Sequence, residues 1–371
     1  MSESSKHYRP GTHPSLPPPV DQSGPLQWMR ENLFSSWLNT ALTLLSIYVL
    51  YLVVPAVLDW ALLSATFEAS SRAECQALND GACWAFIAER FDQFVYGFYP
   101  EALRWRPNLC FALLFVALAP VLFDSVPQRR RMLWFTAAYP FIAYWLLCGG
   151  FGLTPVETTR FGGFLLTLVI GVTGIAASLP LGIVLALGRA SDKPVFKVTC
   201  TMFIEFIRGV PLITLLFVAS TMLNYFLPPG TTFDLLARVL IMVTLFASAY
   251  IAEVVRGGLQ AIPKGQYEAA VASGLGYWQM MRLVVLPQAL KISIPGIVNT
   301  FIGLFKDTTL VVIIGLLDPL GIGGAALSDS NWQGLSTEVY VFIAIFFFIC
   351  CFSMSRYSLY LERKLERGHR S

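Results

Sequence analysis

Apolar residues of this chain fall in runs of about twenty, separated by shorter polar segments. A run of that length is what a helix needs to cross roughly 30 Å of hydrocarbon. The pattern predicts an all-α, polytopic membrane protein with about eight transmembrane helices. We place these spans at residues 37–58, 109–123, 132–150, 161–187, 210–227, 236–255, 284–305 and 338–356.

Composition agrees with a membrane protein and excludes several classes of function. The 371 residues are 56% hydrophobic and 13% charged, about half the charge of a soluble domain. The net charge of +3 gives no sign of nucleic-acid binding. All three histidines, His7, His13 and His369, lie near the termini. The apolar body therefore lacks an imidazole for general-base or metal chemistry, which argues against a membrane enzyme.

The charged residues also predict how the chain is oriented. With the amino terminus inside, 19 of the 26 Lys and Arg residues fall in the terminal or connecting segments on that side. Both termini are then cytoplasmic, and the long polar loop at residues 59–108 lies outside. This loop contains Cys75 and Cys83, which an oxidising compartment would join and a reducing one would leave free. Its aromatic residues suit either a small folded cap or a belt at the headgroups.

Two groups of polar residues near the predicted spans are candidates for function. Glu253 and Arg256 are three residues apart, so they share a helix face and pair at the membrane edge, as a gate or as a local salt bridge. Arg208 follows Glu205 with the same spacing. We expect Glu253, Arg256 and Arg208 to form a gate or interface.

The second group is Lys306, Asp307, Thr308 and Thr309, between two apolar stretches. Charged residues in or near a membrane are costly and are candidates for function. A lysine beside an aspartate offers one anchor for the carboxylate and one for the ammonium of an amino acid. The same four residues would also serve simply as a cap at the end of the seventh span.

A moderately polar segment, YEAAVASGLGYWQMMRLVVLPQAL, lies at residues 267–290. It contains Glu268, Ala269 and Ala270, then Gly274 after three residues, and Leu286 and Pro287 at the start of the next span. In these residues and their spacing the chain resembles the EAA loop of ABC-importer permeases. Three further stretches, RGVPLITLLF, AYIAEVVRGGLQAIPKGQYEAA and LFKDTTLVVIIGLLD, are similar to the polar amino acid branch of that family. The three extra amino-terminal spans resemble the longer permease subunit of general L-amino acid transporters.

The resemblance implies a type I importer core and a set of partners. Residues 1–36 would be a disordered cytoplasmic tail, 37–155 three accessory helices with a periplasmic loop at 59–108, 156–357 the permease core, and 358–371 a basic tail. Within the core, 256–283 would be the coupling segment that docks on an ATPase. The implied partners are a cytoplasmic ABC ATPase dimer, a second and different permease subunit, a periplasmic amino-acid-binding protein and membrane lipid. The chain would be a multi-pass protein of the bacterial inner membrane.

In such a complex the ATPase, not this chain, uses ATP and Mg²⁺. The sequence agrees, because it contains no GxxxxGK[ST] motif, and we expect no cofactor and no enzymatic activity here. The resemblance implies that Glu268, Ala269, Ala270 and Gly274 couple ATP hydrolysis to transport of L-amino acids, and that residues 306–309 contact the substrate. The alternative is a transporter of small zwitterionic solutes that an ion gradient drives, which would need several unpaired acids inside the spans. A subunit without a substrate path of its own is a further alternative.

Overall fold

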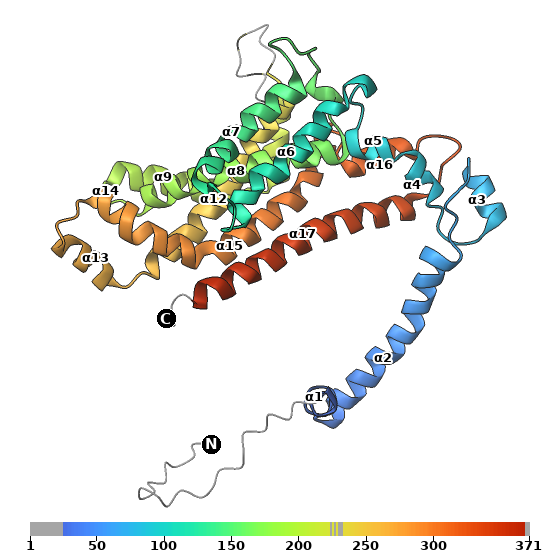
Figure 1. Cartoon of the computed structure of the whole chain (residues 1–371), viewed down its shortest axis with the longest axis horizontal. Coiled ribbons are helices and arrows are strands. Elements are labelled where there is room, and N and C mark those ends of the chain that lie inside the picture. Colours follow the sequence, from blue (N-terminus) through green and yellow to red (C-terminus); the bar gives the residue numbers. More distant parts are fainter. Residues whose placement is uncertain (1–24, 223–224, 226–227, 229–232, 368–371) are drawn as a thin grey trace, which may run out of the picture. The chain divides into compact units, whose positions relative to one another are not determined.

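The protein is helical along the part of the chain that the structure describes (Figure 1). The structure is a computed structural model that describes residues 25–222, 225, 228 and 233–367. Within these residues there is no β-strand, only isolated bridges that pair Gly97 with Phe161 and Gly150 with Leu153. The prediction of an all-α fold is therefore confirmed.

The chain divides into two units, which we describe separately. The first comprises residues 1–66 and 76–82. It contains α1 (Pro25–Asn32) and α2 (Trp37–Leu58), which a π-helical turn continues to Leu63. Helix α1 lies within the segment 1–36 that we expected to be disordered, and residues 1–24 are outside the described part.

The second unit comprises residues 67–75 and 83–371 and contains the other long helices of the described residues. Helix α3 (Arg72–Leu78) begins in this unit. The remaining helices are α4 (Ala85–Glu89), α5 (Phe91–Tyr96), α6 (Trp105–Leu122), α7 (Arg129–Cys148), α8 (Gly163–Arg189), α9 (Pro194–Gly209), α10 (Leu212–Phe217), α12 (Leu235–Gln260), α13 (Lys264–Ala272), α14 (Tyr277–Met280), α15 (Leu286–Asp307), α16 (Pro319–Ala326) and α17 (Ser336–Arg367).

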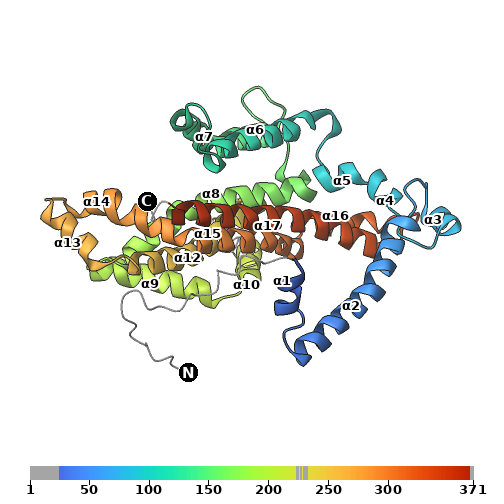
Figure 2. The same ribbon diagram turned by 60° about the horizontal axis from the view of Figure 1, so that its bottom comes forward.

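Helices α8, α12, α15 and α17 run side by side in this unit (Figures 1 and 2). Close approach of their backbones depends on small residues, as in other membrane helices. A Cβ atom on Gly182 of α8 would lie 2.6 Å from Cγ2 of Ile251 on α12. The packing of α8 against α12 therefore requires this glycine.

The two ends of this unit carry different structures. Helices α13 and α14 lie at one end, and α4, α5 and α16 lie at the other (Figure 2). We call these the coupling end and the cap end. At the cap end, a disulfide joins Cys75 and Cys83. The backbone N–H of Cys83 donates to Oε1 of Glu338 at 3.2 Å, and the Trp332 side chain is 1% exposed.

The long polar loop is thus a folded cap and not a loose belt of aromatic residues. Arg72 donates from Nη1 to the carbonyl of Gln333 at 2.6 Å, and Arg90 forms an ion pair with Asp329. Both contacts join the loop to the segment between α16 and α17. Partners from distant parts of the chain create a small apolar core there, which loop composition alone does not reveal.

The number of membrane-spanning helices differs from the eight we expected. Within the described residues, six helices are long and apolar enough to cross a membrane, or seven if α9 with α10 and its π-helical extension counts as one span bent by 102°. The remaining predicted span corresponds to α7, a 20-residue helix. It is less apolar than the other spans because it begins with three arginines, and Trp, Tyr and Thr residues interrupt the apolar sequence that follows. The end of the predicted fifth span, from residue 223 to 227, contains residues outside the described part.

Candidate coupling segment and substrate site

The polar segment between α12 and α15 folds into the short helices α13 and α14 at the coupling end. Pro263 precedes the first residue of α13 and has a φ of −59°, which suits entry to a helix. The Tyr267 hydroxyl donates to the carbonyl of Leu259 on α12 at 3.3 Å. Burial raises the pKa of this phenol. The tyrosine therefore fixes α13 against the end of α12.

A glycine ends α13 and turns the chain toward α14. Gly274 has a φ of +76°, a backbone conformation that suits glycine best. Its N–H donates to the carbonyl of Val271 at 2.9 Å, and the N–H of Leu275 donates to the carbonyl of Ala270 at 3.1 Å. These two bonds form a Schellman motif, which satisfies carbonyls at the helix end. The turn that we predicted at Gly274 is present in the structure.

The EAA triplet presents two residues to the outside and one to the interior. Glu268 and Ala269 are exposed, whereas Ala270 is 4% exposed and packs within the protein itself. Only Ala269 of the two alanines is thus on the surface available to another protein. Trp278 on α14 is 72% exposed, and Tyr277 beside it is also exposed. Sequence reasoning did not single out this aromatic pair.

The coupling segment is joined directly to the start of α15. A π-helical turn, Met281–Val285, continues α14 into α15, which begins at Leu286 and has Pro287 in its first turn. The Gln288 side chain donates from Nε2 to Oε1 of Gln266 on α13 at 3.1 Å. A displacement of α13 would therefore act on α15 through the backbone and through this bond.

Next to this segment, Glu253 on α12 is surrounded by three arginines. Its Oε2 lies 3.0 Å from Nε of Arg256, 3.2 Å from Nη1 of Arg189 and 3.7 Å from Nη1 of Arg208. Glu205 on α9 accepts from Arg189 at 2.8 Å. We call these five residues the arginine–glutamate cluster. It ties together α8, α9 and α12 where α12 approaches the coupling segment.

The cluster confirms that the predicted residues Glu253, Arg256 and Arg208 lie together, and it adds two members. The spacing of three between Glu253 and Arg256 predicted their pairing. Glu205 and Arg208 have the same spacing, and in the structure Glu205 binds Arg189. Arg189 comes from another helix, so no local pattern could have found it.

The candidate substrate residues lie at the other end of α15, about 30 Å from Leu286 at 1.5 Å per residue. Helix α15 ends at Asp307 and a 3₁₀ helix follows from Thr308. The Thr308 hydroxyl donates to the carbonyl of Phe305 at 2.8 Å, and that of Thr309 donates to the carbonyl of Lys306 at 2.9 Å. Both hydroxyls thus complete the helix end, as the capping interpretation expects.

Lys306 itself has no ion-pair partner within the described residues. It is exposed, and no carboxylate of that part of the chain lies within 4.0 Å of its Nζ, including that of the adjacent, half-buried Asp307. An ammonium group near a membrane is costly without a counter-charge. The geometry therefore leaves Lys306 available to an anionic group from outside this chain.

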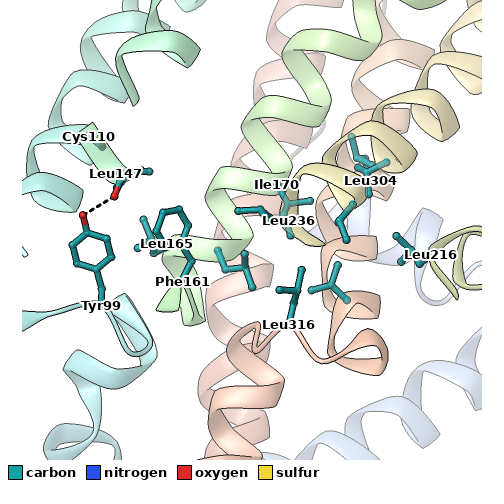
Figure 3. Packing of buried hydrophobic residues seen from close by; sticks show 14 of the residues in the cluster. Tyr99, Cys110, Leu147, Phe161, Leu165, Ile170, Leu216, Leu236, Leu304 and Leu316 are labelled. Carbon is teal, nitrogen blue, oxygen red and sulfur yellow. Dashed lines mark hydrogen bonds between the residues drawn. The ribbon is translucent and has the colours of Figure 1, made fainter. Parts of the chain in front are cut away.

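The core helices meet in a buried cluster near these residues. Figure 3 shows Leu304 and Leu316, on either side of the 3₁₀ helix, with Ile170 of α8 and Leu236 of α12. The same view shows Tyr99, whose hydroxyl donates to the carbonyl of Leu147 on α7 at 2.9 Å. This packing holds the end of α15 in the core, and therefore also holds the backbone of Lys306 in place.

The second unit is thus a bundle of membrane helices with a short helical segment exposed at one end. Comparison with known proteins gives the class. Residues 178–367 match the family described as "Binding-protein-dependent transport system inner membrane component". The chain belongs to this family, and it is a permease subunit of an ATP-driven importer, not an enzyme.

Relatives extend the similarity over nearly the whole chain. The chain is 50% identical to the glutamate/glutamine/aspartate/asparagine transport system permease protein BztC of Rhodobacter capsulatus, over 95% of this chain and 96% of BztC. It is 52% identical to the inner membrane amino-acid ABC transporter permease protein YhdY of Escherichia coli, over 96% of this chain and 97% of YhdY. A crystal structure of an amino acid ABC transporter with histidines matches with 29% identity over 54% of this chain and 91% of that chain, at a TM-score of 0.48. The family match and the two relatives confirm the resemblance to polar amino acid permeases, and the alternative of an ion-driven transporter is set aside.

Proposed function

We propose that this subunit carries L-amino acids with polar or acidic side chains, together with a second, different permease subunit. A cytoplasmic ATPase dimer would bind and hydrolyse ATP with Mg²⁺, and an extracytoplasmic binding protein would deliver the substrate. The chain itself would bind no cofactor. The proposal is supported by the names of the relatives, which concern amino-acid transport and, for BztC, glutamate, glutamine, aspartate and asparagine.

In the proposed orientation, both termini and the coupling end are cytoplasmic, and the cap end faces the oxidising side of the inner membrane. Two observations support it. The arginine–glutamate cluster and Lys264 lie at the coupling end, as the excess of positive charge on the inner side requires. The disulfide between Cys75 and Cys83 lies at the cap end, where an oxidising compartment would preserve it.

Coupling would proceed through α13 and α14. Their exposed residues, including Glu268, Ala269 and Trp278, would contact the ATPase. When the ATPase dimer closes, the segment would move and carry the end of α12 and the start of α15 with it. Because the arginine–glutamate cluster joins α8 and α9 to α12, these helices would move as one body between two states.

The unpaired Lys306 is the observation that carries the substrate assignment. The carboxylate of a substrate amino acid would pair with the Lys306 ammonium, and its ammonium would pair with the Asp307 carboxylate. The Thr308 and Thr309 hydroxyls donate to backbone carbonyls. Because both hydroxyl protons are donated to the backbone, Thr308 and Thr309 would hold the helix end in place and would not donate to the substrate.

Uptake of labelled glutamate and glutamine by the whole complex in proteoliposomes tests this assignment. We expect Lys306→Met to lower uptake about tenfold or more, because a hydrogen bond to a charged group contributes about 1.5–3 kcal/mol, while the basal ATPase rate is kept. Lys197→Met removes an exposed lysine from α9 and serves as the matched control. If Lys306→Met and Lys197→Met transport with equal affinity and rate, residues 306–309 are a helix cap and not a binding site.

Purification of the tagged protein from its own membrane tests the proposed partners. Mass spectrometry of the complex in mild detergent should find an ATPase and a second permease in fixed ratio. Recovery of this chain alone, or of a homo-oligomer without an ATPase, would refute the proposed assembly.

A further inference from the structure

An apolar cavity of about 170 Å³ separates the hairpin of α6 and α7 from α8 and α12 of the core. Leu114 and Leu147 line it from the hairpin, and Leu165, Val172 and Leu240 line it from the core. An apolar cavity of about 150 Å³ in another protein stays dry and takes up apolar molecules such as benzene. This cavity is therefore suited to an apolar group and not to water.

The cavity lies in the half of the membrane nearer the cap end. Along α8 its lining extends from Leu165 to Thr173, which is about 12 Å at 1.5 Å per residue, and it begins near the first residue of that helix. Along α7 it extends from Tyr139 to Cys148, the last residue of the helix. This depth corresponds to one leaflet of a hydrocarbon layer about 30 Å thick, so acyl chains of that leaflet surround the hairpin at the level of the cavity.

The lining has one charged residue, Asp234, at the outer margin of the cavity, whereas the polar side chains of Tyr139 and Thr173 lie deeper. Asp234 accepts a hydrogen bond from the Thr158 hydroxyl, and its other oxygen accepts from the N–H of Ala237 at 2.8 Å, so this carboxylate is satisfied. Arg160 lies two residues after Thr158 in the same 3₁₀ turn. It is exposed and has no ion-pair partner among the residues that the structure describes. A guanidinium at headgroup level is the group that binds a phosphate most strongly.

We propose that a phospholipid of this leaflet places one acyl chain in the cavity and its phosphate against Arg160. The guanidinium of Arg160 complements a phosphate, the Asp234 carboxylate is already hydrogen-bonded within the protein, and the apolar lining complements the acyl chain. The acyl chain of this lipid would pack between the hairpin of α6 and α7 and the helices α8 and α12 of the core. This phospholipid would be a bound lipid with a defined place, unlike the lipid that covers the exposed faces of the spans.

A photoactivatable phospholipid with a diazirine in its acyl chain tests the site in nanodiscs that contain the full-length chain. After illumination, mass spectrometry should find crosslinks concentrated on the lining residues of α8 and α12. Val169→Trp fills the cavity and should lower these crosslinks about tenfold. Val184→Trp is the matched control on the same helix, because Val184 is 62% exposed outside the cavity. Crosslinks that are spread evenly over the exposed faces, or that Val169→Trp does not reduce, would overturn the proposal.

A surface variant gives a second test that does not disturb packing. Native mass spectrometry should find a phospholipid that stays bound to the purified protein through washing with detergent. Arg160→Gln should release it, whereas Arg130→Gln, which removes an exposed arginine near the other end of α7, should not. Retention that is equal in both variants, or the absence of any bound phospholipid in the unmodified protein, would refute the site.

Discussion

The turn at Gly274 provides a direct test of the coupling segment. The perturbation is Gly274→Ala, a single methyl group at the end of α13. Because a Cβ at this position would meet no other atom within 4 Å, the substitution creates no clash. Its whole effect comes from the backbone, whose φ of +76° an alanine adopts only at a cost.

The size of that cost follows from the conformation. A left-handed backbone costs an L-residue about 1–2 kcal/mol relative to glycine. One or two kcal/mol corresponds to a factor of roughly 5–30 in the population of the turn. We therefore expect Gly274→Ala to lower the amount of substrate transported per ATP by a similar factor, because the ATPase would meet a disordered or displaced α14. Gly274→Asn should have a smaller effect, since asparagine tolerates this conformation better.

The assay is ATP-dependent uptake by the reconstituted complex, measured together with ATP hydrolysis. Gly265→Ala is the matched control, because Gly265 lies in the first turn of α13 and a Cβ there also meets no other atom within 4 Å. An alanine in a helix is about 0.5–1 kcal/mol more stable than a glycine, so this variant should transport normally. If the two alanine variants lose coupling equally, or if neither does, the turn at Gly274 does not control coupling.

Three further predictions concern stability. Glu253→Gln leaves three neighbouring guanidinium groups without their shared counter-charge, and we expect a loss of about 1–3 kcal/mol, measured as a lower melting temperature in detergent; an unchanged melting temperature would contradict the role of the cluster. Replacing Cys75 and Cys83 by Ser opens a loop with a sequence separation of 8, which should cost about 2.5 kcal/mol and make the cap sensitive to protease, whereas resistance equal to that of the parent would refute this. A hydrogen bond from Lys364 lowers the pKa of Asp124. The contact is therefore complete at neutral pH and is lost as the pH falls below about 4; hydrogen exchange of the loop after α6 should rise there, and Asp124→Asn should abolish this dependence on pH.

Hydrophobic patterning predicted where the core helices lie but not where all of them end. Helix α12 was expected at 236–255 and extends from Leu235 to Gln260. Helix α17 was expected to end at residue 356 and continues to Arg367, so most of the predicted basic tail is helical. The residues after 356 are too polar for a membrane, yet they include no Gly or Pro before Gly368, and Leu, Glu, Lys and Arg favour a helix. A change in polarity ended the predicted span but did not end the helix.

For the side chains of the candidate site, the sequence predicted contacts between near neighbours but not contacts between distant residues. Gly274 and the pair of Glu253 with Arg256 depend on neighbours in sequence, so their local spacing was informative. Arg189 reaches Glu253 from α8, 64 positions away, and no local signal records that contact. The sequence also could not predict that Lys306 is exposed, because it gives no information on which side chains approach a charged group.

The cap has a consequence for how the protein is made. Cys83 donates its backbone N–H to Glu338, 255 residues later in the chain. At 5–20 residues per second a ribosome needs roughly 13–50 s to synthesise that interval. In the proposed orientation, the outer loop would stay in the oxidising compartment without its packing partners during that time, and the disulfide between Cys75 and Cys83 would be free to form. The disulfide would then constrain the loop before α17, which carries Glu338, is inserted and packs against it.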